Sequence, residues 1–286
     1  MLEILIAAGI EAALRRDPLG NAETTVRILG VDFTSAPRRA KPITVAHGFL
    51  LNSILQVTEI EAIENFDSFD RLLHCPGPWI GGFDFPFGLP RELVRDLGWP
   101  GKWRALVDFC ANLSRREFRG ILDGYRATRP AGQKYAHRRT DLPAGSSSPM
   151  KLVNPPVALM FHEGAPRLAD AGVHIPGLAA GDRSRIALEA YPGLFARSIV
   201  GRTSYKNDAK AKQTSGRRQA RERILAALPV KVSTTLRKQL IADASGDSLD
   251  AVICAAQSAS GWQRRRRNFG LPTRVDPVEG WIVTAR

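Results

Sequence analysis

The sequence predicts an α/β protein in which helices flank a mixed β-sheet. Three observations lead to this fold class: short apolar runs bounded by turn residues, three such runs in close succession, and a helical segment that separates them from a fourth run. A chain of 286 residues can form one large core with insertions or two small domains. We interpret residues 1–25 as an N-terminal extension and 26–286 as a single domain with an insertion at about 91–185.

The first predicted strand covers residues 26–34, contains Asp32, and ends before Ala36 and Pro37. Two further strands are predicted over 42–51 and 54–63, separated only by Asn52 and Ser53. This connection suggests a β-hairpin, although Asn-Ser is a weaker signal than Asn-Gly. Three consecutive antiparallel strands are therefore the simplest interpretation.

A helix is predicted over 65–74, with Asn65 or Asp67 as its N-cap, followed by a strand that begins at Trp79 and contains Asp84. A strand reached through a crossover helix usually lies parallel to one already in the sheet. If it pairs with the first strand, Asp32 and Asp84 become neighbours. Because burying an unpaired carboxylate is costly, we expect a metal ion shared between these strands.

The predicted insertion, about 91–185, has irregular hydrophobic periodicity. A helix is predicted over 103–122, followed by a long loop-rich region that contains several arginines. Loops of this length inside a compact domain are usually functional or mobile. The insertion could cover a substrate, or it could be a solvated and partly disordered surface loop.

The C-terminal part contains a predicted strand over 185–193 that carries Glu189, and a basic segment over 202–223 whose second half is helical and ends at Pro229. Leu249, Val252, Ile253 and Ala256 then follow the spacing of a buried helical face. This helix, predicted over 246–256, presents Asp247 and Asp250 to the element it packs against. A short closing strand is predicted over 280–284.

The composition favours a polyanionic partner. The formal net charge is +13, and lysines and arginines that neutralise phosphates gain affinity by releasing counterions. A soluble basic protein without such a partner is the alternative. The three cysteines are scattered, which supports neither a disulfide framework nor a zinc knuckle and fits a reducing cytoplasm. The apolar start of residues 1–13 is too short to span a bilayer, so we expect a terminal helix there and no membrane partner.

Five acidic residues lie on predicted core elements: Asp32, Asp84, Glu189, Asp247 and Asp250. Mg²⁺ and Mn²⁺ prefer carboxylate oxygens and fill their remaining positions with water or phosphate oxygens. Two such ions about 3.5–4 Å apart can activate a water molecule and stabilise the leaving oxygen of a phosphodiester. A protein that is basic overall but acidic at one point suits this chemistry.

The motifs GVDFTS, GGFDFPFGLP, LEAYPG and DSLDAVICA occur in an order that resembles the DUF429 family of predicted RNase H-like nucleases. The last motif also resembles the D-x-x-D-A helix of RuvC-type resolvases. The resemblance covers residues 26–90 and 185–284. It implies an RNase H-like fold with a mixed five-stranded sheet, in which Asp32, Asp84 and Asp250 bind Mg²⁺ or Mn²⁺ and Asp247 is an additional ligand. Asp84 stands where RuvC-type enzymes generally carry the longer Glu.

Each acidic residue also has a structural interpretation that needs no metal. Asp32 and Asp84 could accept backbone hydrogen bonds in the turns that follow their strands. Asp247 and Asp250 could cap the helix that contains them. Glu189 could pair with an arginine.

Basic residues near the C-terminus could form a track for phosphates, with Tyr205 or Trp262 stacking a base. The candidates are Lys206, Lys210, Arg217, Arg218 and Arg221. The same run of charges could be no more than a solvated face.

Three functions remain open. The first is a metal-dependent nuclease acting on DNA or RNA, with no obligate protein partner. The second is a non-catalytic nucleic-acid-binding protein on the same scaffold. The third is a phosphotransferase of the actin-like fold, which also carries an Asp on its first strand. It ranks last because Phe33 follows Asp32 directly and no glycine-containing phosphate turn is evident.

Overall fold

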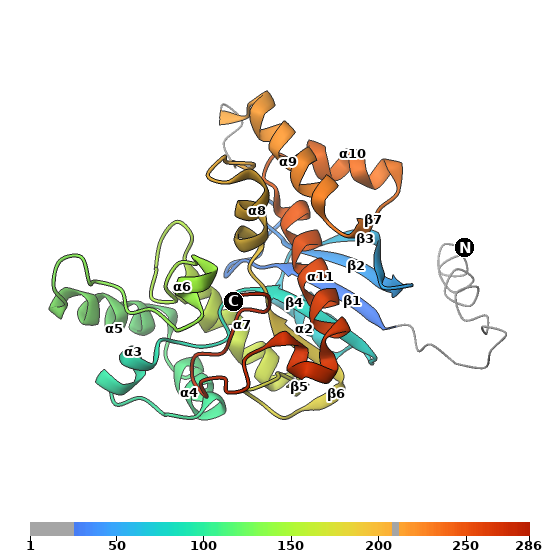
Figure 1. The fold of residues 1–286 in the computed structure, drawn as a ribbon. Coiled ribbons are helices and arrows are strands. Elements are labelled where there is room, and N and C mark those ends of the chain that lie inside the picture. Colours follow the sequence, from blue (N-terminus) through green and yellow to red (C-terminus); the bar gives the residue numbers. More distant parts are fainter. Residues whose placement is uncertain (1–25, 208–211) are drawn as a thin grey trace.

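The centre of the protein is a mixed seven-stranded sheet with strand order β5-β6-β4-β1-β2-β3-β7 (Figure 1). The computed structural model describes residues 26–207 and 212–286. The long strands are β1 (Arg27–Asp32), β2 (Ile43–Leu51), β3 (Ile54–Ile63), β4 (Trp79–Asp84) and β6 (Asp182–Glu189). The edge strands β5 (Val173–His174) and β7 (Val230–Lys231) have two residues each. The predicted N-terminal extension and Lys210 lie outside the described residues.

The pairing confirms the predicted order of the first four strands. β1 lies antiparallel to β2, β2 lies antiparallel to β3, and β4 lies parallel to β1 after the crossover helix α2 (Phe66–His74). The prediction of an α/β mixed sheet flanked by helices is therefore confirmed. Five strands were too few, because β5 and β7 extend the sheet at its two edges. Neither is long enough to produce a recognisable pattern in the sequence.

Helices cover both faces of the sheet. Besides α2 they are α3 (Arg91–Asp96), α4 (Trp103–Ala111), α5 (Arg115–Thr128), α6 (Asp141–Ala144), α7 (Val157–Asp170), α8 (Pro192–Val200), α9 (Ser215–Ala227), α10 (Thr234–Ala242) and α11 (Asp247–Gln263), with the 3₁₀ segment η2 (Arg265–Gly270). Figure 1 shows α11 running along one face of the sheet. Within the described residues, no helix is long and apolar enough to cross a membrane.

Strand alternation divides the interior into two hydrophobic cores. Leu29 and Val31 of β1 point into the core formed with α2, α4 and α7, whereas Ile28 points into the core formed with α8, α9, α10 and α11. Successive side chains of a strand point to opposite faces, so Asp32 lies on the same face as Ile28, toward α11.

The insertion is loop-rich over 129–156, as predicted, since the only helix described there is the short α6; the helices α3 and α7 near its two ends were not predicted. The predicted helix over 103–122 is two helices, α4 and α5, because Ser114 and Glu117 form a capping box that starts a new helix. The hydrophobic spacing continues through this break and hides it.

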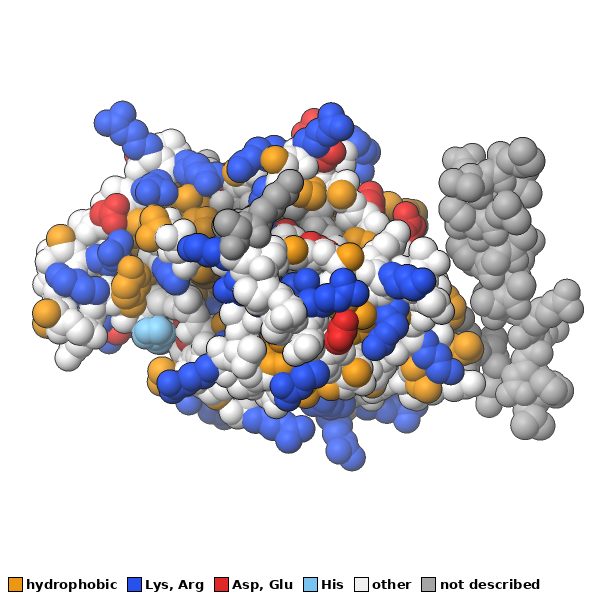
Figure 2. Space-filling view, turned by 90° about the horizontal axis from the view of Figure 1, so that it is seen from above, with side chains coloured by type: hydrophobic (Ala, Val, Ile, Leu, Met, Phe, Trp, Pro, Cys, Tyr) orange, Lys and Arg blue, Asp and Glu red, His pale blue; other side chains and the backbone are white. Residues whose placement is uncertain are grey.

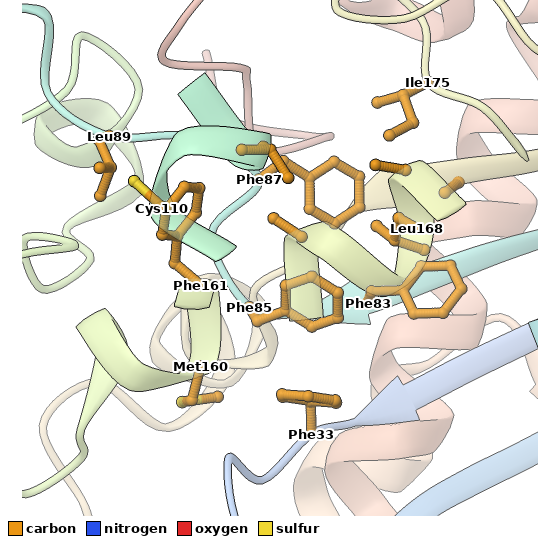
Figure 3. Packing of buried hydrophobic residues seen from close by; sticks show 14 of the residues in the cluster. Phe33, Phe83, Phe85, Phe87, Leu89, Cys110, Met160, Phe161, Leu168 and Ile175 are labelled. Atoms are coloured by element: carbon orange, nitrogen blue, oxygen red, sulfur yellow. The ribbon is translucent and has the colours of Figure 1, made fainter. Parts of the chain in front are cut away.

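Helix α7 holds the insertion against the sheet through an aromatic cluster (Figure 3). The rings of Phe33 and Phe85 have centroids 4.6 Å apart, and those of Phe85 and Phe87 are 5.3 Å apart. A Cβ at Gly164 of α7 would lie 2.6 Å from the Phe85 ring, so only glycine permits this contact. The insertion is thus packed on the same loop that follows Asp84.

Two C-terminal predictions also need correction. No closing strand forms over 280–284, where Ile282 makes only an isolated parallel bridge with Glu189. The predicted helix over 246–256 continues to Gln263 as α11, since its buried face extends through Ala259.

Candidate functional site

The ends of two adjacent parallel strands bring Asp32 and Asp84 together. In the register of β1 and β4 these residues are direct partners, and both are the last residues of their strands. Neighbouring strands lie about 4.8 Å apart, so the two carboxylates leave the sheet side by side. The predicted adjacency is confirmed.

Two glycines allow α11 to approach this pair. A Cβ at Gly30 would lie 2.1 Å from the carbonyl oxygen of Ala251, and one at Gly82 would lie 2.3 Å from that of Cys254. Real Cβ atoms cannot occupy these positions, so the glycines let the helix backbone rest directly on β1 and β4. The N-terminal turn of α11, which carries Asp247 and Asp250, is therefore placed beside the strand ends.

The two helix aspartates are bound by lysines. Lys41 Nζ donates to both oxygens of Asp247, at 2.9 and 2.7 Å. Lys206 Nζ donates to Oδ2 of Asp250, and the Tyr205 hydroxyl donates to Oδ1 at 2.6 Å. The Asp250 side chain has 0 % exposure, so this pairing compensates a fully buried charge.

The two strand aspartates differ from those of the helix. Among the described residues, neither Asp32 nor Asp84 makes a side-chain hydrogen bond or an ion pair. Asp32 is only 8 % exposed and lines the cavity described below. A buried carboxylate without a partner is costly, and this cost is what a bound cation would remove.

The turn and capping roles considered for these aspartates are filled by other residues. After β1, it is Thr34 Oγ1 that accepts the backbone N–H of Ala36. At the start of α11, Asp243 accepts the backbone N–H groups of Ser245 and Ser248, at 3.1 and 2.9 Å. The four carboxylates at the site are thus not explained by turn or cap hydrogen bonds.

Burial and the repulsion between the carboxylates shift the pKa values of the residues at the site. Burial, followed by the charge of Asp247, holds the pKa of Asp32 well above its ordinary value. Burial, followed by the charge of Asp250, raises the pKa of Asp84 to about 7. Burial lowers the pKa of Lys206, but the charges of Asp250, Tyr205 and Asp32 outweigh it, so the net pKa is raised and the ammonium stays charged. The four carboxylates therefore carry an excess of negative charge that the two lysines offset only in part.

Glu189 is held in a buried ion pair. Arg138 Nη1 and Nη2 donate to its two carboxylate oxygens at 2.8 and 2.7 Å, and the backbone N–H of Phe87 adds a third bond at 3.0 Å. Arg138 also binds Asp141, so one guanidinium joins the insertion to β6. Glu189 therefore pairs with an arginine, which is the structural interpretation considered for it from the sequence.

A cavity of about 830 Å³ opens over the four aspartates. The insertion contributes part of its lining through Arg138, Ser146, Ser147 and residues 154–157, together with Met160 of α7. The insertion was interpreted either as a cover over the substrate or as a solvated surface loop. This lining agrees with the cover.

The basic candidates are dispersed. Lys206 lies at the aspartates, whereas Arg221 is 4 % exposed and donates to the backbone carbonyls of Ile241 and Tyr205. Arg218 pairs with Glu222, and Arg217 lies near Ser204. Figure 2 shows Lys and Arg side chains spread over the face seen there, with fewer Asp and Glu. These four residues do not form a single continuous track.

Lys41 was the site residue that sequence reasoning missed. It belongs to the basic turn directly after β1, and its position close behind Asp32 was the available signal. Its partner Asp247 is 206 positions away, so nothing local identified the pair. The described residues contain no group of three His, Cys, Asp or Glu side chains that could hold a metal ion.

Comparisons with protein-family models, with curated proteins and with solved structures gave no significant match to this chain.

Proposed function

We propose that this protein is an RNase H-like nuclease that hydrolyses phosphodiester bonds of DNA or RNA with the help of Mg²⁺ or Mn²⁺. One observation carries the proposal. Asp32 and Asp84 are register partners on parallel strands, lack side-chain partners in the described part of the chain, and lie beside two further aspartates of α11. The motif order that resembles the DUF429 family supports the same conclusion.

The donor set fits a hard divalent cation. Carboxylate oxygens are the ligands that Mg²⁺ and Mn²⁺ prefer. Asp32 and Asp84 would bind the ion, and Asp250 and Asp247 would join them once Lys206 and Lys41 are released. A divalent ion held there would activate water and stabilise negative charge on the phosphate.

The two lysines have a second role once the metal ion is bound. When they leave Asp250 and Asp247, their ammonium groups remain at the edge of the cavity, since both residues line it. An ammonium group is a good point-charge ligand for phosphate oxygens. We therefore assign Lys41 and Lys206 to the binding of the substrate phosphate.

The proposal is tested by cleavage of labelled single- and double-stranded DNA and RNA in Mg²⁺ or Mn²⁺. Asp32→Asn keeps the size of the side chain but removes its charge, and we expect it to lower cleavage by about 100-fold or more. Asp108→Asn is the matched control, because Asp108 lies on α4 with a side chain 48 % exposed and pairs with Arg104 of the same helix. Cleavage retained by a folded Asp32→Asn variant would remove the proposed centre.

The second candidate is a nucleic-acid-binding protein without catalysis. It is favoured by the ion pairs of Lys41 with Asp247 and of Lys206 with Asp250, which neutralise two acids without any metal. Salt-sensitive binding of DNA and RNA, with no metal-dependent cleavage of either, would support this candidate.

A further inference from the structure

Besides the aspartates, the lining of the cavity includes apolar and aromatic side chains that phosphodiester chemistry does not require, and these form the apolar part of its surface. They are Phe85, Pro86, Pro156, Val157, Met160 and Tyr191. They come from three regions: the loop after β4, the insertion, and the start of α8. A site that bound only a phosphate would need charged and polar groups, so this apolar surface calls for an apolar part of the ligand.

The size of the cavity suits a single small ligand. Its volume of about 830 Å³ falls within the roughly 300–1,000 Å³ typical of small-molecule sites. One nucleotide has both of the required parts: a phosphate for the acidic end and a flat base for the apolar end.

Three of the four carboxylates are almost fully buried, whereas Asp84 is partly exposed. Asp250 is 0 % exposed, and Asp32 and Asp247 are each 8 % exposed. In a duplex, the base of every nucleotide is stacked and paired, so a base could contact the apolar part of this cavity only if its nucleotide were extruded or the strand were single. An unpaired nucleotide can enter the cavity with its phosphate at the aspartates.

A stacking surface lies at the rim. Tyr191 and Arg197 both line the cavity; the guanidinium lies 5.2 Å from the ring centroid, and its Nη1 donates to the tyrosine hydroxyl at 3.1 Å. Arg197 also donates to the carbonyl of Ala144 in α6, which fixes the pair against the insertion. Aromatic rings and guanidinium planes are the groups on which proteins stack unpaired bases.

We propose that this cavity accepts one unpaired nucleotide, so that the protein acts on single-stranded nucleic acid and not on paired duplex. The inference rests on the proposed nuclease function and specifies its substrate class. The insertion, through Val157 and Met160, supplies the selectivity.

The test compares three substrates in Mn²⁺: a single-stranded 20-mer, the same strand in a blunt duplex, and a 20-mer of tetrahydrofuran abasic residues, which has the phosphodiesters but no bases to contact the apolar part. We expect the single strand to be cleaved at least about tenfold faster than the duplex. Val157→Trp fills the apolar part, and we expect it to slow single-strand cleavage about tenfold while changing cleavage of the abasic 20-mer less than about twofold. Met160→Trp is the second variant, in case one of the two does not fold.

Leu142→Trp is the matched control, because Leu142 is 75 % exposed on α6 and is not among the residues that line the cavity. Equal cleavage of strand and duplex, or a folded Val157→Trp that slows both reactions alike or neither, overturns the inference and leaves the nuclease function standing. Absence of cleavage of all three substrates removes the nuclease function instead.

Fluorescence anisotropy without metal measures the binding of strand and duplex, and so tests the unpaired-nucleotide cavity independently of cleavage. Tighter binding of the single strand than of the duplex, lost in Val157→Trp, supports the unpaired-nucleotide cavity. Equal binding of the two overturns it.

Discussion

At the scale of single residues, the site is defined by which carboxylates have partners. Asp250 and Asp247 form ion pairs with Lys206 and Lys41, while Asp32 and Asp84 form none with a described side chain and are offset only in part by the nearby charge of Lys206. The sequence predicted the four aspartates: Asp32 and Asp84 lie in short apolar runs where a charge is unexpected, and Asp247 and Asp250 lie at the start of a helix with a buried face. It did not identify their lysine partners, because those contacts depend on tertiary packing.

We expect Asp84 to make the folded protein less stable as the pH rises. Its folded-state pKa of about 7 lies above the ordinary 3.8, so the folded state binds more protons than the unfolded state and stability falls as pH rises through this window. Asp84→Asn removes the carboxylate charge and with it the loss of stability at high pH. We expect it to raise the melting temperature at pH 8 by roughly 2–4 °C for each kcal/mol gained, and to have little effect near pH 4. Thermal unfolding in EDTA measures this difference.

Asp243→Asn is the control with the opposite sign. Burial raises the pKa of Asp243, but its hydrogen bonds from Ser245 and Ser248 outweigh burial and lower it. Stability from this group is present above the unfolded-state pKa and is lost as pH falls, so its replacement should lower the melting temperature at pH 8. An Asp84→Asn variant that melts lower than wild type at pH 8 would contradict the assigned repulsion.

Lys206 should compete with a divalent cation for Asp250. Lys206→Met removes the ammonium, so we expect Mn²⁺ to bind about tenfold more tightly, equivalent to about 1.4 kcal/mol, as measured by titration calorimetry. The metal-free variant should also be less stable, because it leaves the fully buried Asp250 without its cation. Lys231→Met, at an exposed position of β7, is the control. Unchanged or weaker Mn²⁺ binding in Lys206→Met would show that the two cations do not compete.

At the scale of elements, the site depends on how closely α11 lies against the sheet. Gly30 and Gly82 alternate with large apolar residues in strands that were recognised from their short apolar runs. The crossover through α2 predicted that β4 would lie beside β1. The division of residues 103–122 into two helices was not predicted, because Ser114 interrupts the chain without interrupting the apolar spacing. Helix α7 was missed as well, since Pro166 within it argues locally against a helix.

Gly30→Ala should separate α11 from β1. The added methyl group would lie 2.1 Å from the carbonyl oxygen of Ala251, so the helix must shift, and we expect a loss of about 1–3 kcal/mol in the free energy of unfolding. Gly120→Ala is the control, because an added Cβ on α5 meets nothing within 4 Å, and alanine is favoured over glycine in a helix by about 1 kcal/mol. Denaturant unfolding measures both. Equal stability of wild type and Gly30→Ala would show that the contact is not tight.

At the scale of the whole molecule, a protein with a net charge of +13 concentrates four aspartates at one point. The composition predicted the basic surface but not its distribution, because the cationic side chains come from elements far apart in the chain (Figure 2). The sequence left open whether the insertion covers the site or forms a solvated loop, because the choice depends on packing such as that of Gly164 against Phe85. The long strands and the acidic motifs followed from local patterns, whereas the enclosure of the site follows from packing between distant segments.

The most direct test of the aspartate centre is a crystal structure of the protein grown with Mn²⁺, with data that record its anomalous scattering. We predict an anomalous peak bound by Asp32 and Asp84, with Lys206 turned away from Asp250. A map without a peak at these aspartates, in which Lys206 and Lys41 still hold Asp250 and Asp247 at saturating Mn²⁺, would contradict the proposed metal centre.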